Sequence, residues 1–157
     1  MKNNWKNKFK IEQRQALKTT QVFADRETNN FIVDFLKTFE WLHTVAYWDR
    51  KRYSIWLGTP SYKWEIITEE EAHLRARIWV QWIVDKYELW DLNQRERAAV
   101  VSFIYNVWSL DNNQIRLLKN KYNCALWNSF LQYSYSNWQY LKWLANRRMS
   151  ERNLLCN

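Results

Sequence analysis

The spacing of apolar residues predicts a helix that ends at an acidic residue. Residues 1–27 are polar with weak periodicity, and we expect an N-terminal extension there that can form one helix. From Thr28 onward the apolar residues follow the spacing of one helix face, with Thr28 or Asn29 as the cap. This helix is expected to end near Glu40, which places the carboxylate in its last turn. The apolar face consists of Phe31, Ile32, Phe35, Leu36 and Phe39.

Between residues 45 and 57 the helical spacing gives way to short aromatic and β-branched runs. The segments VAYWD and YSIWL are separated by the polar residues RKR, and this arrangement predicts a β-hairpin. The GTPSYK that follows is typical of a turn.

Two capping motifs predict the helices of the second half. Thr68-x-x-Glu71 precedes a long helix, and Asn93 with Glu96 precedes RAAVVSFIYNV. From about Asn112 to the C-terminus the pattern predicts three or four short amphipathic helices. Together these elements favour an α+β fold with a small hairpin lobe and a C-terminal helical bundle.

Size and composition are those of one globular domain. The 157 residues suffice for a single core, which we place at residues 28–157 after the extension of residues 1–27. No apolar run approaches the ~20 residues that span a bilayer, so stable membrane insertion is not expected. The basic N-terminal segment MKNNWKNKFKIEQRQ lacks the apolar stretch of a signal peptide, so we expect the protein to be located first in the cytoplasm.

The charge balance favours an anionic partner. The net charge is +8, which suits nucleic acid, a membrane surface or a bacterial wall, and charge alone does not choose among them. Only DRKR and NRR are tight basic groups, and neither is typical of a nucleic-acid-binding arm. Nucleic acid is therefore not expected as the partner.

The two cysteines predict no metal site. Cys124 and Cys156 lie far apart in the sequence and outside any CxxC or Cys/His cluster. We expect two reduced, partly buried thiols rather than a metal site or a disulfide.

One pair of carboxylates has the chemistry of glycoside hydrolysis. Glu40 is expected at the end of a helix, and Asp49 lies nine positions later on the first strand of the predicted hairpin. Hydrolysis of a glycosidic bond needs one protonated carboxyl to donate to the leaving oxygen and one ionised carboxylate to act on water or the sugar. Spacing alone is weak evidence, because most such pairs are surface charges.

The surrounding residues resemble the phage-type lysozymes, the endolysin family. FLKTFEWLHTVAYWD (residues 35–49) is similar to the family pattern Glu-Gly followed by Leu-x-x-x-Ala-Tyr-x-Asp. The family strand Thr-Ile-Gly-x-Gly corresponds to SIWLG (residues 54–58), after a turn one residue shorter than usual. ITEEEA, LNQRERAAVVSFIYNVW and LKWLANRRMSERNLL resemble three further family motifs in the family's order. The resemblance spans about residues 30–156 and implies a mostly helical lysozyme-like fold with a small β-hairpin lobe.

The resemblance assigns roles residue by residue. It implies that Glu40 is the general acid, that Asp49 is the second carboxylate, and that Ser54 holds the attacking water where the family usually has threonine. Arg147 matches the arginine that pairs with the catalytic glutamate, the alternative being a surface arginine near a helix start. Family members of this type invert the anomeric carbon.

Three further positions match residues that line the family's glycan cleft. These are Leu57, Tyr105 and Asn106, although Tyr105 could equally be a core residue. His43 and His73 match no family position, so a histidine-dependent mechanism is not expected.

The implied function is a peptidoglycan hydrolase, a muramidase that cleaves the β-1,4 bond between N-acetylmuramic acid and N-acetylglucosamine. The resemblance implies a bacteriolytic monomer without a cofactor, held in the host cytoplasm until it is released to the wall. An alternative is a catalytically impaired lysozyme-like module that binds glycan, because Ser54 departs from the family pattern. A third is a basic, Trp-rich protein acting on membranes or nucleic acid.

The chain has one glycine and twelve tryptophans, whereas average usage predicts about 7% glycine. Several tryptophans stand where the family has glycine or where the local sequence is turn-like. We hypothesise that the gene comes from a lineage that decodes UGA as glycine and that these codons are rendered as tryptophan. UGG codons at these positions would contradict the idea. The four at family glycine positions are Trp41, Trp56, Trp108 and Trp143, and the two in turn-like settings are Trp64 and Trp138.

Overall fold

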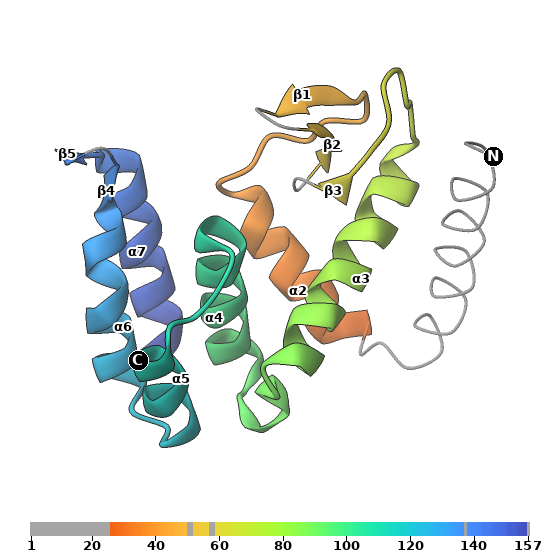
Figure 1. Cartoon of the computed structure of the whole chain (residues 1–157). Helices are drawn as coiled ribbons and strands as arrows, with labels where there is room; N and C mark the ends of the chain where they lie inside the picture. Colours follow the sequence, from red (N-terminus) through yellow and green to blue (C-terminus); the bar gives the residue numbers. More distant parts are fainter. Residues whose placement is uncertain (1–25, 50–51, 57–58, 137, 157) are drawn as a thin grey trace, which may run out of the picture.

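The computed structural model describes residues 26–49, 52–56, 59–136 and 138–156. These residues form a mostly helical α+β fold with a small sheet at one end, which confirms the predicted fold class (Figure 1). The predicted extension of residues 1–27 lies almost entirely outside the described residues. The elements are α2 (Arg26–Lys37), β1 (Tyr47–Asp49), β2 (Arg52–Ile55), β3 (Thr59–Pro60), α3 (Glu69–Lys86), the 3-10 helix η2 (Leu89–Asp91), α4 (Gln94–Val107), α5 (Asn112–Lys119), α6 (Asn123–Phe130), the 3-10 helix η3 (Leu131–Ser134), β4 (Tyr135–Ser136), β5 (Gln139–Tyr140) and α7 (Lys142–Leu155).

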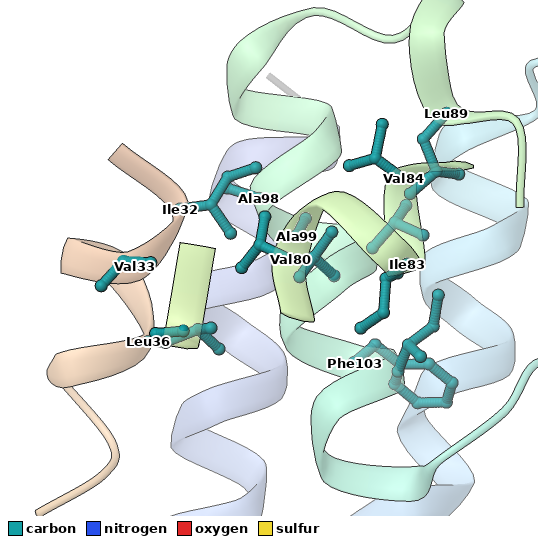
Figure 2. Close-up of a cluster of buried hydrophobic side chains, with 14 of the residues drawn as sticks. Ile32, Val33, Leu36, Val80, Ile83, Val84, Leu89, Ala98, Ala99 and Phe103 are labelled. Carbon is teal, nitrogen blue, oxygen red and sulfur yellow. The ribbon is translucent and has the colours of Figure 1, made fainter. Parts of the chain in front are cut away.

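Helix α4 is the centre of the molecule. It packs against α2 and α3 on one side and against α7 on the other, and α7 in turn packs on α6 (Figure 1). Its residues from Arg97 to Ile104 are all buried, as expected for a helix whose apolar residues are not confined to one stripe. Figure 2 shows the core where α2, α3 and α4 meet, including Ile32, Leu36, Val80, Ile83, Ala98, Ala99 and Phe103.

Helix α2 ends slightly earlier than the apolar pattern predicts. Its buried residues include Ile32 and Leu36, whereas Phe31 and Phe35 are only partly buried against the core. The last helical residue is Lys37, but the backbone N–H of Glu40 still donates to Leu36 O at 3.2 Å. Glu40 is therefore held by the last hydrogen bond of the helix, just beyond its end.

The predicted hairpin is present and has a third short strand. In the β1–β2 pair Tyr47 lies opposite Ser54, and Asp49 lies opposite Arg52. Strand β3 adds to the other edge of β2, giving the order β1-β2-β3. A bridge between Val45 and residue 66 ties the lobe to the segment before α3. The second hairpin, β4–β5, was not predicted.

The predicted caps of α3 and α4 are formed, with one difference, but the prediction of Thr28 or Asn29 as the cap of α2 is wrong, because α2 begins at Arg26 and both residues lie inside the helix. Asn93 and Glu96 make both bonds of a capping box at the start of α4. At the start of α3, Thr68 accepts from the backbone N–H of Glu71 at 3.2 Å, but the Glu71 carboxylate binds Arg75 at 2.7 Å. The i,i+4 arginine competes successfully for that carboxylate. In the described part of the chain, no helix is both long and apolar enough to cross a bilayer.

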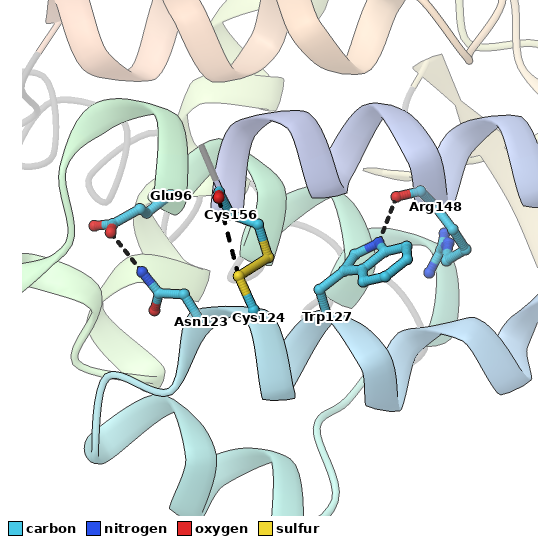
Figure 3. Close-up of a disulfide and its surroundings, with 6 residues drawn as sticks. All are labelled: Glu96, Asn123, Cys124, Trp127, Arg148 and Cys156. Atoms are coloured by element: carbon cyan, nitrogen blue, oxygen red, sulfur yellow. Dashed lines mark hydrogen bonds between the residues drawn. A yellow bond between two sulfur atoms is a disulfide. The ribbon is translucent and has the colours of Figure 1, made fainter.

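The expectation of two reduced thiols is wrong, because Cys124 and Cys156 form a disulfide (Figure 3). Their Cα atoms lie 5.2 Å apart because α6 packs beside the end of α7, a contact between segments that the sequence separates by 32 residues. Beside the bond, Trp127 Nε1 donates to Arg148 O at 2.7 Å. Helices α6 and α7 are therefore joined covalently and by a side-chain hydrogen bond.

Reduction of this disulfide is expected to destabilise the fold. By the chain-entropy estimate, closing a loop of this length lowers the entropy of the unfolded chain enough to stabilise the native state by about 3–4 kcal/mol. Urea unfolding with and without dithiothreitol measures the difference. A variant with both cysteines replaced by serine is the control, because its unfolding should not respond to dithiothreitol. An unchanged urea midpoint for the reduced wild type would contradict the expectation.

Three of the six suspect tryptophans have left-handed backbone. The φ angles are 67° at Trp64, 73° at Trp108 and 64° at Trp138. Among the described residues only Glu88 and Lys121 share a positive φ without being glycine. Trp108 is the C-terminal cap of α4, where helices very commonly use glycine in this conformation. These three positions support the glycine hypothesis independently of any family pattern; Trp41, Trp56 and Trp143 have no positive φ.

Candidate active site

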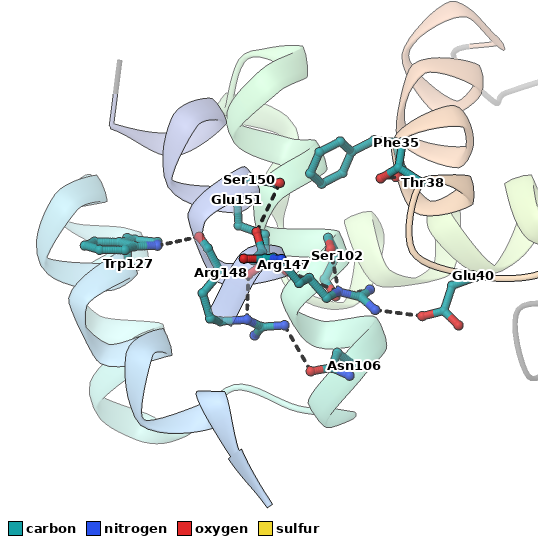
Figure 4. Close-up of polar contacts among 11 residues, drawn as sticks. Phe35, Thr38, Glu40, Ser102, Asn106, Trp127, Arg147, Arg148, Ser150 and Glu151 are labelled. Carbon is teal, nitrogen blue, oxygen red and sulfur yellow. Dashed lines mark hydrogen bonds and ion pairs between the residues drawn. The ribbon is translucent and has the colours of Figure 1, made fainter. Parts of the chain in front are cut away.

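The centre of the candidate site is an ion pair between Glu40 and Arg147. Arg147 Nη1 donates to Glu40 Oε1 at 2.6 Å, across 107 residues of sequence (Figure 4). The Arg147 side chain is fully buried, whereas that of Glu40 is 27% exposed. The Glu40 carboxyl is thus held by a buried arginine and is still accessible to solvent. The alternative that Arg147 is a surface residue does not hold.

The fold positions Arg147 from several directions. Its Nε and Nη2 groups donate to Ser102 Oγ at 3.2 Å and to Ser102 O at 3.0 Å, in the middle of α4. The rings of Phe39 and Tyr105 lie 5.0 and 5.4 Å from the guanidinium carbon. Arg147 therefore presents its remaining N–H groups toward Glu40 in one orientation.

Behind Arg147 lies a second buried ion pair. Glu151 accepts from Ser102 Oγ at 2.7 Å, and its other carboxylate oxygen lies 3.1 Å from Arg148 Nε. Arg148 also donates to Asn106 Oδ1 at 3.0 Å (Figure 4). Burial raises the pKa of Glu151 to about 7, against the lowering effect of the two arginines. Burial likewise lowers the pKa of Arg148 to about 10.

The two predicted cleft residues on α4 differ in their surroundings. Asn106 is half-buried and is the acceptor for Arg148. Tyr105 is also half-buried, packs edge-on against Trp79 at 5.2 Å and flanks Arg147. Tyr105 is thus both a neighbour of the core and part of the wall that holds Arg147 in place.

The hairpin supplies the other predicted residues. Ser54 is fully buried on β2, and its hydroxyl has no hydrogen-bond partner among the described residues. Asp49 is the last residue of β1. The predicted cleft residue Leu57 lies outside the described residues.

The histidines have local partners. His43 lies against the ring of Tyr47 at 4.7 Å, and His73 Nε2 lies 3.6 Å from Glu69 Oε1. In the ranges that the structure describes, no group of three or more His, Cys, Asp and Glu side chains could hold a metal ion.

The sequence interpretation missed Ser102, Arg148 and Glu151. Two patterns could have identified them. A serine within the apolar run AAVVSFI is a buried polar residue that needs partners, and an acidic residue three and four positions after two arginines shares a helix face with both.

The comparisons with known proteins concern the family and the fold. The phage lysozyme family model matches residues 37–151. No curated protein matches the chain. Among solved structures, the muramidase domain of SpmX from Asticaccaulis excentricus has a TM-score of 0.67 at 23% sequence identity, covering 80% of this chain and 95% of that domain. Its identity is low enough that the likeness shows the fold alone, a lysozyme-like one. The family match includes Glu40 and the arginine pair and covers most of the chain, and the chain therefore belongs to the phage lysozyme family.

Proposed function

We propose that this chain is a lysozyme-type peptidoglycan hydrolase that cleaves the β-1,4 bond between N-acetylmuramic acid and N-acetylglucosamine. The observation that carries the proposal is the Glu40 carboxyl, partly open to solvent and held at 2.6 Å by an arginine that is itself fully buried. A general acid must reach the glycosidic oxygen and must be held still in the right direction. Glu40 meets both requirements.

The catalytic steps follow from the two carboxyl groups. Glu40 donates its proton to the leaving oxygen, while Asp49, at the end of β1, acts on the attacking water and balances the positive charge at the sugar. The water attacks the face of the sugar opposite the leaving group, so the product has inverted configuration. Leu57, Tyr105 and Asn106 are the proposed contacts to the glycan.

Ser54 is the proposed holder of that water. A buried hydroxyl with no partner among the described residues is costly, and a bound water would satisfy it. The side chain belongs to β2, the strand next to the one that ends at Asp49. Serine can make the same hydrogen bond as the family's threonine, so activity does not require the usual residue.

Ser54→Thr is expected to keep activity, and Ser54→Val is expected to lower kcat by roughly 10-fold or more, because one hydrogen bond to the water is worth about 1.4 kcal/mol. The two substituted side chains have nearly the same shape and differ in the hydroxyl. Initial rates of peptidoglycan hydrolysis measure the effect. Equal rates for the two variants would remove Ser54 from the mechanism.

The proposed site of action is the bacterial wall, after release from the cytoplasm of the host cell. A net charge of +8 attracts the chain to an anionic polymer. The Cys124–Cys156 disulfide is typical of proteins that work in oxidising surroundings, because cytoplasmic thiols are kept reduced. Both features fit an endolysin that lyses the host cell from within.

A second candidate function is glycan binding without cleavage. Its support is Trp108, which lies two residues after Asn106 and contacts Arg52 of the hairpin with 5.4 Å between the guanidinium carbon and the ring. The Trp108 indole lies between α4 and the hairpin, close in sequence to the proposed cleft residues Tyr105 and Asn106, and it occupies space there. Such bulk could slow turnover while leaving weak binding.

Hydrolysis of purified peptidoglycan separates the two functions. A fall in turbidity together with new reducing ends of muramic acid supports the hydrolase. Co-sedimentation with the wall without either change supports the binding module. Absence of both contradicts both functions for this chain.

A further inference from the structure

We propose that Arg148 is a positioning residue that fixes the side-chain amide of Asn106 with its N–H groups outward, so that Asn106 binds the carbonyl oxygen of an acetamido group on the glycan. The inference rests on the proposed function, in which Asn106 contacts the glycan, and it goes further by naming the group that is recognised. It also assigns a role to a buried arginine that the proposed catalytic steps do not use.

The hydrogen bond between Arg148 and Asn106 has only one possible polarity. Arg148 Nη2 donates to Asn106 Oδ1 at 3.0 Å (Figure 4). A guanidinium group has N–H donors and no acceptor, whereas a side-chain amide has an oxygen that accepts and a nitrogen that donates. The amide oxygen of Asn106 must therefore face Arg148, and its amide nitrogen points away from Arg148.

Arg148 is held firmly enough to impose this orientation. Its side chain is fully buried, its Nε lies 3.1 Å from Glu151 Oε2, and its guanidinium carbon lies 4.9 Å from the centre of the Phe103 ring. Its Nη1 group has no hydrogen-bond partner among the described residues. A buried cation with an unsatisfied donor is costly to the fold, and such costs are typical of residues that are kept for function.

The amide nitrogen of Asn106 is available to a ligand. Asn106 is half-buried, and in the part of the chain that the structure describes no residue accepts a hydrogen bond from its Nδ2 group. It lies on α4 one turn after Ser102, which holds Arg147 through its hydroxyl and its backbone carbonyl. The two N–H groups of the amide are therefore close to the arginine that binds the Glu40 carboxyl.

An outward amide nitrogen complements a ligand group that only accepts hydrogen bonds. Each sugar of the proposed substrate carries an acetamido group, and its carbonyl oxygen is such an acceptor. A carbonyl oxygen binds the outward N–H groups of an amide, but the outward oxygen of a carboxylate repels it. A sugar hydroxyl both donates and accepts, so it can bind either side chain. The exchange of amide for carboxylate therefore distinguishes the two kinds of sugar group.

The test compares two neutral β-1,4-linked probes, tetra-N-acetylchitotetraose and cellotetraose, which has hydroxyls in place of the acetamido groups. Calorimetry measures all affinities in the Glu40→Gln background, so that neither probe is cleaved. Asn106→Asp keeps the shape of the side chain and an oxygen for Arg148, but it replaces the outward N–H groups by a second oxygen. We expect it to weaken binding of the acetylated probe by roughly 10-fold, the value of one hydrogen bond, and not to weaken binding of cellotetraose.

Variants of Arg148 test its positioning role. Arg148→Met removes the donor and lets the amide turn, so binding of the acetylated probe should weaken by about 3-fold, the cost of ordering one side chain. Arg148→Lys keeps a donor toward Asn106 Oδ1 and should restore the affinity. Thermal unfolding is measured alongside, because a merely structural role predicts that affinity and stability fall together in both variants.

Asn113→Asp is the matched control for the added charge. Asn113 of α5 is exposed and also accepts from an arginine, Arg116 Nη2, at 2.9 Å, so this variant should bind both probes as the parent does. Equal weakening of both probes by Asn106→Asp, unchanged binding of the acetylated probe, or no binding of that probe by the parent would each overturn the proposal. Hydrolysis plays no part in these measurements, so a chain that binds as expected and cleaves nothing contradicts the proposed function alone.

Discussion

Replacing Trp64, Trp108 and Trp138 together by glycine is expected to raise the melting temperature by roughly 3–12 °C, at about 2–4 °C for each kcal/mol in a chain of this size. Each position has left-handed backbone, in which a Cβ costs about 1–2 kcal/mol. Glycine also has greater conformational freedom in the unfolded chain, and this cancels about half of the gain in stability. The net effect is about 0.5–1 kcal/mol per site, or about 1.5–3 kcal/mol for the three together. All three side chains are exposed, so none leaves a core cavity.

Alanine variants at the same three positions separate the effect of the left-handed backbone from the effect of the indole side chain. Alanine removes the indole but keeps the Cβ, so the difference between the glycine and alanine variants measures the left-handed backbone alone. Trp82→Gly, at an exposed position inside α3, is the opposite control and should lose about 1 kcal/mol. Equal melting temperatures for the glycine and alanine triples would contradict the backbone argument. Trp56 is left out because its indole is buried, and removing it would open a cavity.

The codons test the origin of these tryptophans directly. UGA at codons 64, 108 and 138 would support the glycine hypothesis, and mass spectrometry of the protein from its natural source would show which residue the ribosome inserts. Codons 41, 56 and 143 extend the same test to positions where the backbone has no positive φ and therefore gives no sign of a glycine. UGG at all six would end the hypothesis.

Glu40→Gln is expected to lower kcat for peptidoglycan hydrolysis by roughly 10²–10⁴-fold, the usual contribution of a general acid. Glutamine keeps the shape of the side chain and an oxygen that can still accept from Arg147, but it has no proton to donate. Binding to the wall should be nearly unchanged, because only the chemical step needs the proton. The release of new reducing ends measures the rate, and co-sedimentation measures the binding.

Two controls accompany this prediction. Glu69→Gln changes an exposed carboxylate of α3 in the same way and should hydrolyse at the wild-type rate. Thermal unfolding of Glu40→Gln shows whether the loss is chemical, since removing one partner of Arg147 also weakens an ion pair. Full activity of a folded Glu40→Gln variant would exclude Glu40 as the acid.

Local patterns predicted the elements well, because their causes are local. The apolar stripe of α2, the capping residues Thr68 and Asn93 and the aromatic runs of the hairpin each act within a few positions. The Glu40–Arg147 pair lies 107 residues apart, and only the resemblance of both segments to one family brought it into view. The contact between Glu40 and Arg147 depends on how the whole fold packs and cannot be predicted from either segment alone.

The misses have the same physical origin. The disulfide depends on how α6 meets the end of α7, and two lone cysteines contain no information about that approach. Ser102 and Glu151 were passed over because polar residues are usually assigned to the surface, whereas here each satisfies another. Hairpin β4–β5 comprises two strands of two residues each, too short for any periodicity to show.

The position of Trp41, immediately after Glu40, has a consequence for gene transfer. Arg147, which binds the Glu40 carboxyl, and Ser102, which holds Arg147, are both encoded after this codon. If codon 41 is UGA, a bacterium with the standard genetic code ends translation at Glu40 and makes a fragment without α3, α4 or α7. A copy of the gene that entered such a cell would yield no folded enzyme, and the proposed lytic activity would stay within the lineage that shares its code.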